Sequence, residues 1–164
     1  MTFLLSKDGR NEDFAGCFAR YKAYLQENKD KFPVSAFELA NSVWYSDASD
    51  HRCPHDAWLE SLQLSEQSHG DRSELRYSTI KIRLLAPYHD GFIELTYPKV
   101  FSYRITAYNC LRGHLDWRYE EFRLSDNGQI IHEIEWASDD DGVWLIEASD
   151  VLYQWVPRAE AHSR

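Results

Sequence analysis

The spacing of apolar residues changes from a helical period to a period of two near residue 58. The clearest example follows residue 76, where Ile80, Ile82 and Leu84 alternate with charged side chains, as in a strand with one buried face. Similar segments follow at short intervals, and Asn127-Gly128 between two of them is a strong hairpin signal. Short turns between successive strands indicate antiparallel pairing. The chain after residue 58 therefore predicts an antiparallel sheet.

The chain before the alternating segments has the pattern of helices. Residues 13–28 carry apolar side chains at spacings of three and four, and Pro33 ends this pattern. A second helix is expected from Ser35, where Ser35 and Glu38 fit a capping box, to about Tyr45. The predicted class is α+β, with two N-terminal helices followed by a curved antiparallel β-sheet of six to eight strands.

The length of 164 residues suits one domain. We expect a single domain over 1–164, with a helical part at 1–50, a sheet at 51–157 and a tail at 158–164. The sheet residues expected in the core are Ile80, Ile82, Leu84, Ile93, Leu95, Phe101, Tyr103 and Ile105.

The formal net charge is −9, and the charge is unevenly distributed. Residues 124–157, called here the acidic segment, contain no Lys or Arg. Because phosphate groups are bound by clustered Lys and Arg, we expect neither nucleic acid nor an anionic membrane as a partner. The carboxylates of the acidic segment are Asp126, Glu133, Glu135, Asp139, Asp140, Asp141, Glu147 and Asp150.

Two features indicate a cytoplasmic protein. The N-terminus has only a short apolar run at Phe3-Leu4-Leu5, unlike a secretory signal. The three cysteines are odd in number and widely spaced, unlike a disulfide framework. No apolar run reaches the roughly 18 residues of a transmembrane helix.

The densest group of possible metal ligands is His51, Cys53 and His55. Zinc sites normally combine such ligands with a second, distant pair, which this sequence does not offer at workable spacing. No glycine-rich phosphate loop or nucleophile elbow occurs either. We therefore expect no metal, no cofactor and no catalytic residues, which favours a protein that is not an enzyme.

Three short segments carry a resemblance: HDAWL from His55, YEE from Tyr119 and HEI from His132. In this order, over about residues 50–155, they resemble small bacterial single-domain proteins of unassigned function. Some proteins of that kind are similar to immunity proteins encoded beside toxins. The resemblance implies a noncatalytic protein that binds a partner.

Two functions follow as hypotheses. The first is an immunity or inhibitor module that binds a basic protein, such as a toxin, with its acidic segment, because carboxylates steer a basic partner and aromatic side chains anchor it. The alternative is a small-molecule-binding or hydrolytic protein whose sheet pocket contains His55, His132 and Glu133. The residues predicted for the first hypothesis are Asp139, Asp140, Asp141, Glu133, Glu135 and Trp144.

Overall fold

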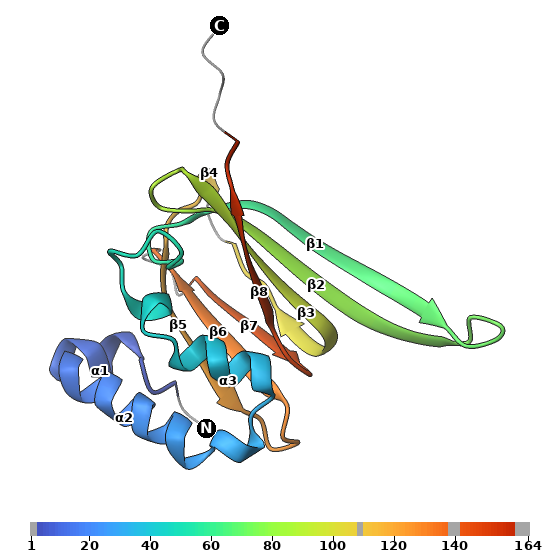
Figure 1. Cartoon of the computed structure of the whole chain (residues 1–164), viewed down its shortest axis with the longest axis horizontal. Coiled ribbons are helices and arrows are strands. Elements are labelled where there is room, and N and C mark those ends of the chain that lie inside the picture. The colour runs from blue at the N-terminus through green and yellow to red at the C-terminus, as the bar shows by residue number, and fades with distance from the viewer. Residues whose placement is uncertain (1–2, 108–109, 138–141, 160–164) are drawn as a thin grey trace, which may run out of the picture.

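The structure of the chain, a computed structural model, describes residues 3–107, 110–137 and 142–159. Within them, the helices come first in the chain and the strands follow (Figure 1). The helices are α1 (Lys7–Glu12), α2 (Phe14–Glu27) and α3 (Val34–Asn41), with 3-10 turns at Lys29–Lys31 and Trp44–Ser46. The strands are β1 (Trp58–His69), β2 (Leu75–Leu85), β3 (Gly91–Arg104), β4 (Leu111–His114), β5 (Trp117–Leu124), β6 (Ile130–Trp136), β7 (Val143–Ala148) and β8 (Leu152–Pro157). The predicted α+β class is confirmed. None of the described helices has the length and apolar character needed to cross a bilayer.

Seven of the strands form one antiparallel sheet in the order β1-β2-β3-β7-β6-β5, with β8 paired to β3. Strand β3 joins the two parts of this sheet, because residues 91–96 pair with β8 and residues 100–104 pair with β7. Strand β2 occupies the opposite side of β3. The strand number lies within the predicted range. Strands β1 and β5 are the two end strands of this order, and β8 is a further strand paired with β3 alone among the described residues.

Strand β3 contains a β-bulge at Pro98, where it has one residue more than β2 opposite. A second irregularity lies next to Phe101 in the pairing with β7. The two irregularities break the simple alternation of faces, and Phe101 and Tyr103 are exposed. Their predicted place in the core is wrong for this reason. The other core predictions hold for Ile80, Ile82, Leu84, Ile93 and Leu95, which are fully buried, while Ile105 is partly buried against the core.

Helix α3 starts differently from the prediction. The expected capping box of Ser35 and Glu38 is not among the hydrogen bonds of the described residues, and the helix already ends at Asn41. Instead, the carboxylate of Asp150, from the loop after β7, accepts a hydrogen bond from the backbone N–H of Ala36 at 3.0 Å. A distant carboxylate thus replaces the local cap, satisfying a free backbone donor of the first helical turn.

Helix α2 covers the outer edge of β5 with two tyrosine side chains. The Tyr21 hydroxyl accepts a hydrogen bond from the Phe122 N–H at 2.8 Å and donates one to the Phe122 carbonyl at 3.1 Å. The Tyr24 hydroxyl accepts a bond from the Leu124 N–H at 2.8 Å. Unpaired backbone groups on an edge strand can template pairing with another chain, so these bonds close part of β5 to such pairing.

An ion-pair network ties the N-terminal segment to β5 and β6. Glu121 and Glu133 lie opposite each other on these strands, and Arg123 forms ion pairs with both. Glu121 also accepts hydrogen bonds from the backbone N–H groups of Leu4 and Leu5, at 3.1 and 2.8 Å. Burial raises the pKa of Glu121, whereas these backbone bonds and Arg123 act against that rise. Arg123 therefore holds together two carboxylates that would otherwise repel each other.

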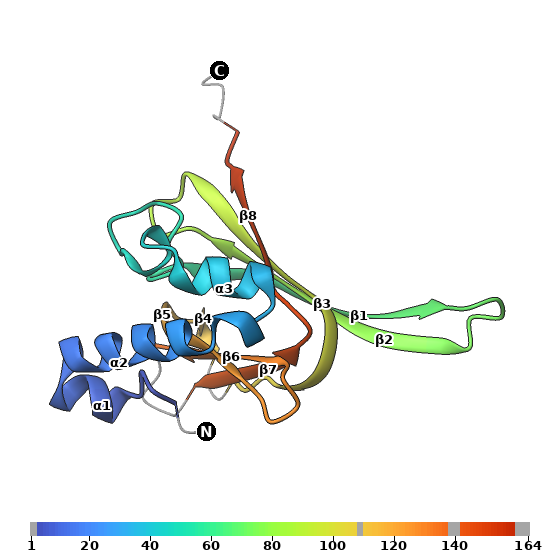
Figure 2. The same cartoon turned by 60° about the horizontal axis from the view of Figure 1, so that its bottom comes forward.

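The far ends of β1 and β2 form a hairpin arm, defined here as residues 64–78, that projects from the rest of the molecule. Figures 1 and 2 show it from two directions, and in both it extends away from the helices. The side chains of the arm are exposed or partly buried, whereas Ile80 at its base is fully buried. The arm consequently contributes little to the core.

The Arg123 network predicts an asymmetry between two arginines. Arg123→Leu should lower the free energy of unfolding by about 3–5 kcal/mol, because it leaves two opposed, largely buried carboxylates without their cation. Arg20→Leu breaks an exposed ion pair with Asp13 and should cost less than about 1 kcal/mol. Urea unfolding followed by tryptophan fluorescence measures both. Similar small losses for the two variants would contradict the role given to Arg123.

Candidate functional site

A pocket of about 400 Å³ lies between α2, residues 45–55 and the start of β5. A smaller cavity of about 50 Å³ extends it between α2 and β5 and shares several of its residues. The larger volume falls in the range of small-molecule sites. Its apolar lining comes from Leu5, Phe14, Phe18 and Tyr119, and its polar lining includes Lys22, Tyr45, His55, Arg118 and Glu120.

Glu120 is the acidic group of this pocket, and it lines both cavities. Glu120 faces Ile134 across β5 and β6, on the core side of the sheet. Burial raises the pKa of Glu120 to about 7, while a hydrogen bond from the Trp117 indole N–H and the nearby Tyr45 hydroxyl act in the opposite direction. Among the described residues, the ion pairs include none with Glu120. This carboxyl can therefore exchange a proton near neutral pH.

Tyr45 and Cys53 are buried beside Glu120. The Tyr45 hydroxyl has no hydrogen-bond partner among the described residues, although it lies near the carboxyl of Glu120. The Cys53 thiol donates to the Tyr45 carbonyl at 3.1 Å, and burial raises its pKa to about 12. The thiol therefore stays protonated and is not an activated nucleophile.

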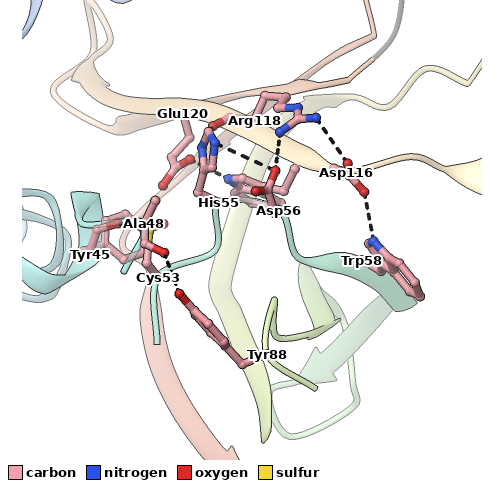
Figure 3. A network of polar contacts seen from close by, with 11 residues as sticks. Tyr45, Ala48, Cys53, His55, Asp56, Trp58, Tyr88, Asp116, Arg118 and Glu120 are labelled. Carbon is pink, nitrogen blue, oxygen red and sulfur yellow. Dashed lines mark hydrogen bonds and ion pairs between the residues drawn. The ribbon is translucent and has the colours of Figure 1, made fainter. Parts of the chain in front are cut away.

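A polar network fixes the wall of the pocket that contains His55 and Arg118 (Figure 3). The Arg118 guanidinium pairs with Asp56 and, at 3.2 Å, with Asp116, which accepts a hydrogen bond from the Trp58 indole at 2.8 Å. The His55 Nδ1 atom lies 2.6 Å from the Arg118 carbonyl. In Figure 3 Glu120 lies on the side of His55 that faces Tyr45, away from the two aspartates. The charge of Arg118 is thus balanced by Asp56 and Asp116, and not by Glu120.

Of the predicted residues of the acidic segment, the three that the structure describes do not form an open acidic face. Trp144 is fully buried in the core, so its predicted role as a surface anchor is wrong. Glu133 is bound to Arg123, and Glu135 forms an ion pair with the buried Arg10 at 2.8 Å. The N-terminal helix and β5 supply the cations that the acidic segment lacks. Asp139, Asp140 and Asp141 lie outside the described residues.

The alternative pocket of His55, His132 and Glu133 is also not formed. The side chain of His132 is fully buried, where Nδ1 lies 2.6 Å from the Tyr97 hydroxyl, and burial lowers the pKa of His132 to about 3. His132 is therefore neutral at ordinary pH. Glu133 is the next residue on β6 and so faces the opposite side of the sheet. Of the three residues, His55 alone lines the pocket described above.

The expected absence of a metal was based on His51, Cys53 and His55. In the structure His51 contacts Asp90, Cys53 contacts Tyr45, and His55 contacts the Arg118 carbonyl. Within residues 3–107, 110–137 and 142–159, no three His, Cys, Asp or Glu side chains are grouped closely enough to hold a metal ion.

Sequence reasoning missed Glu120 and Tyr45. A signal for Glu120 was present, because it precedes Phe122 by two residues and so shares the core face of that strand. The adjacent Glu121 obscured this signal, since two consecutive glutamates are typical of a solvated strand. Tyr45 offered no such signal, because its position depends on the turn after α3 and on contacts with β5.

The pKa of Glu120 predicts a pH-dependent stability difference. Unfolding returns this carboxyl to a pKa near 4.5. As the pH rises, Glu120 therefore loses its proton at a lower pH in the unfolded chain than in the native protein. Deprotonation thus favours the unfolded chain, and the native protein loses stability between pH 4.5 and 7. Glu120→Gln removes this effect. Relative to the natural protein, the variant should gain about 3 kcal/mol across this interval, from 1.4 kcal/mol per pKa unit.

Urea unfolding of both proteins at several pH values measures this difference. Comparison of the two proteins cancels the contributions of other groups, including His132. A stability difference that does not change between pH 4.5 and 7 would contradict the raised pKa.

No protein-family model, curated protein or solved structure matches this chain. The pocket itself offers apolar walls and a carboxyl that forms no ion pair among the described residues and has a pKa near neutral. These groups suit the binding of a small molecule with one polar end.

Proposed function

We propose that this protein binds a small, mainly apolar molecule in the Glu120 pocket. The observation that carries the proposal is the Glu120 carboxyl, which forms no ion pair among the described residues and lines a cavity of about 400 Å³. Sites for small molecules typically combine apolar walls with a few convergent polar groups, often with perturbed pKa values. The alternative hypothesis also assumed a small-molecule ligand, but in a pocket of His55, His132 and Glu133. Of these residues, His55 lines the pocket proposed here.

The chemistry of the pocket favours a ligand whose polar end donates hydrogen bonds. Among the described residues Glu120 forms no ion pair, so an amine or hydroxyl on the ligand would add a second donor to that of the Trp117 indole. An ammonium group would bind the carboxylate form and would lower the pKa of Glu120. The rings of Phe14, Phe18 and Tyr119 would enclose the apolar part of the ligand. A ligand carboxylate directed at Glu120 would be repelled.

Three probes with the same ring test this polarity. Benzylamine, benzyl alcohol and benzoate can be titrated separately into ¹⁵N-labelled protein at pH 7.5, with amide chemical shifts as the readout. Benzylamine should bind best and benzoate worst, with shifts at residues 14–22, 45–55 and 118–120. Glu120→Gln should weaken benzylamine about tenfold and benzyl alcohol less than about twofold, since only the first loses a charge-assisted bond.

Two alanines offer a matched control. Ala48 is exposed and lines the pocket, so Ala48→Trp should fill the cavity and abolish binding of benzylamine. Ala23 is an exposed residue of α2 outside the pocket lining, and Ala23→Trp should leave binding unchanged. Equal binding by the two tryptophan variants, or shifts confined to other residues, would contradict the proposed site.

Binding of a basic protein partner by an immunity or inhibitor-type module is the second candidate function. The net charge of −9 favours a basic partner, and the resemblance noted in the sequence points to the same class. The acidic segment supports this function less than its composition suggested, because Glu133 and Glu135 are already paired with arginines. A partner would need a different surface.

A further inference from the structure

The two end strands of the sheet differ in how their edges are protected. The Tyr21 and Tyr24 hydroxyls occupy backbone groups of β5. Strand β1 is contacted by β4, and Trp58 at its start forms a bridge with Asp116. Residues 63–69 of β1 are called here the free edge. They pair with β2 on one side, and no other strand among the described residues pairs with them on the other side.

Apart from the charge of Glu66, the free edge lacks the devices that usually block edge-to-edge pairing. Native edge strands are commonly protected by lysine, proline, short length or a bulge. Strand β1 is twelve residues long and contains no Lys, Arg or Pro. Its register irregularity lies between Leu59 and Ser61, before the free edge. The arm thus exposes an extended backbone with unused donors and acceptors.

The side chains of the free edge define the strand that would fit. Leu64 lies opposite the buried Ile80 and is 48 % exposed, so it extends the apolar face of the sheet to the edge. Glu66 follows on the same face and has only a 3.5 Å exposed ion pair with Arg76, which holds it weakly. An added strand would therefore match this edge with an apolar residue beside Leu64 and a Lys or Arg beside Glu66.

A second copy of the chain fits this edge poorly. Pairing the whole free edge with itself around a two-fold axis requires residue 66 of both copies to lie at the centre. The two Glu66 side chains would then be directly opposite each other, where like charges are destabilising. Charge complementarity consequently favours a different, basic chain.

We propose that the free edge of β1 binds an extended basic segment of another protein by β-strand addition. Main-chain hydrogen bonds would provide the attachment, and the Leu64 and Glu66 positions would select an apolar and a basic residue two positions apart. This inference deepens the second candidate function and is independent of the Glu120 pocket.

A peptide that alternates threonine with lysine and leucine, TKTKTLTLT, is the probe. Fluorescence polarisation of the labelled peptide measures binding to the full-length protein, and amide hydrogen exchange locates it. Exchange should slow at residues 63–69 and stay unchanged at residues 122–124, which the tyrosines already cover. A peptide with glutamate in place of lysine, and one with N-methyl groups on alternate backbone nitrogens, should bind at least about tenfold more weakly.

Variants of matched exposure separate the arm from general charge. Leu64→Lys should weaken the peptide about tenfold by placing a charge beside its leucine, and Glu66→Lys should weaken it about tenfold by opposing its lysine. Phe101→Lys adds the same charge at a side chain that is also 48 % exposed, and Glu38→Lys reverses an exposed charge on α3. Both controls should change affinity by less than about twofold. These positions lie on exposed surfaces, and circular dichroism checks that each variant folds.

The outcomes distinguish the inference from the function on which it rests. Binding that is insensitive to Leu64→Lys, or that protects other residues, would overturn the assignment of the free edge and leave a basic partner possible elsewhere. Undiminished binding of the N-methylated peptide would overturn strand addition. Absence of binding at low salt by all the peptides would overturn both the free edge and the basic-partner function.

Discussion

The N-terminal segment and the pocket both depend on two adjacent glutamates of β5, Glu120 and Glu121. Their side chains point to opposite faces of the strand; Glu121 is fully buried and Glu120 is partly buried. Glu121 is compensated by Arg123 and by the N–H groups of Leu4 and Leu5, which fixes the N-terminal segment on the sheet. Glu120 forms no ion pair among the described residues and has a pKa of about 7. Glu121 therefore stabilises the fold, whereas the carboxyl of Glu120 is available to a ligand.

The pocket and the hairpin arm lie at opposite ends of the sheet, the pocket beside β5 and the arm on β1. Helix α2 covers the edge of β5 through Tyr21 and Tyr24, and in doing so it builds one wall of the Glu120 pocket. At the other end of the sheet, β1 extends beyond the helices as an arm (Figure 2). One end strand therefore contributes to a cavity, while the other keeps an open edge for a polypeptide.

The sequence predicted the parts of the fold that depend on local spacing. The α+β class and the Asn127-Gly128 hairpin follow from periodicity and turn chemistry. Contacts between distant segments were not accessible in this way. The capping of α3 by Asp150 joins residues far apart in the chain, and the pairing of Glu135 with Arg10 depends on where the helices dock. The functional site belongs to this second group.

The pKa of Glu120 is the most direct test of this account. Selective ¹³C labelling of glutamate side chains allows each carboxyl to be titrated by NMR, and the signal absent from Glu120→Gln identifies Glu120. We predict a midpoint near pH 7, moving downward when benzylamine is added, because an ammonium group stabilises the carboxylate. A midpoint near 4.5 that benzylamine does not change would show an ordinary solvated carboxyl and would contradict the pocket as a ligand site.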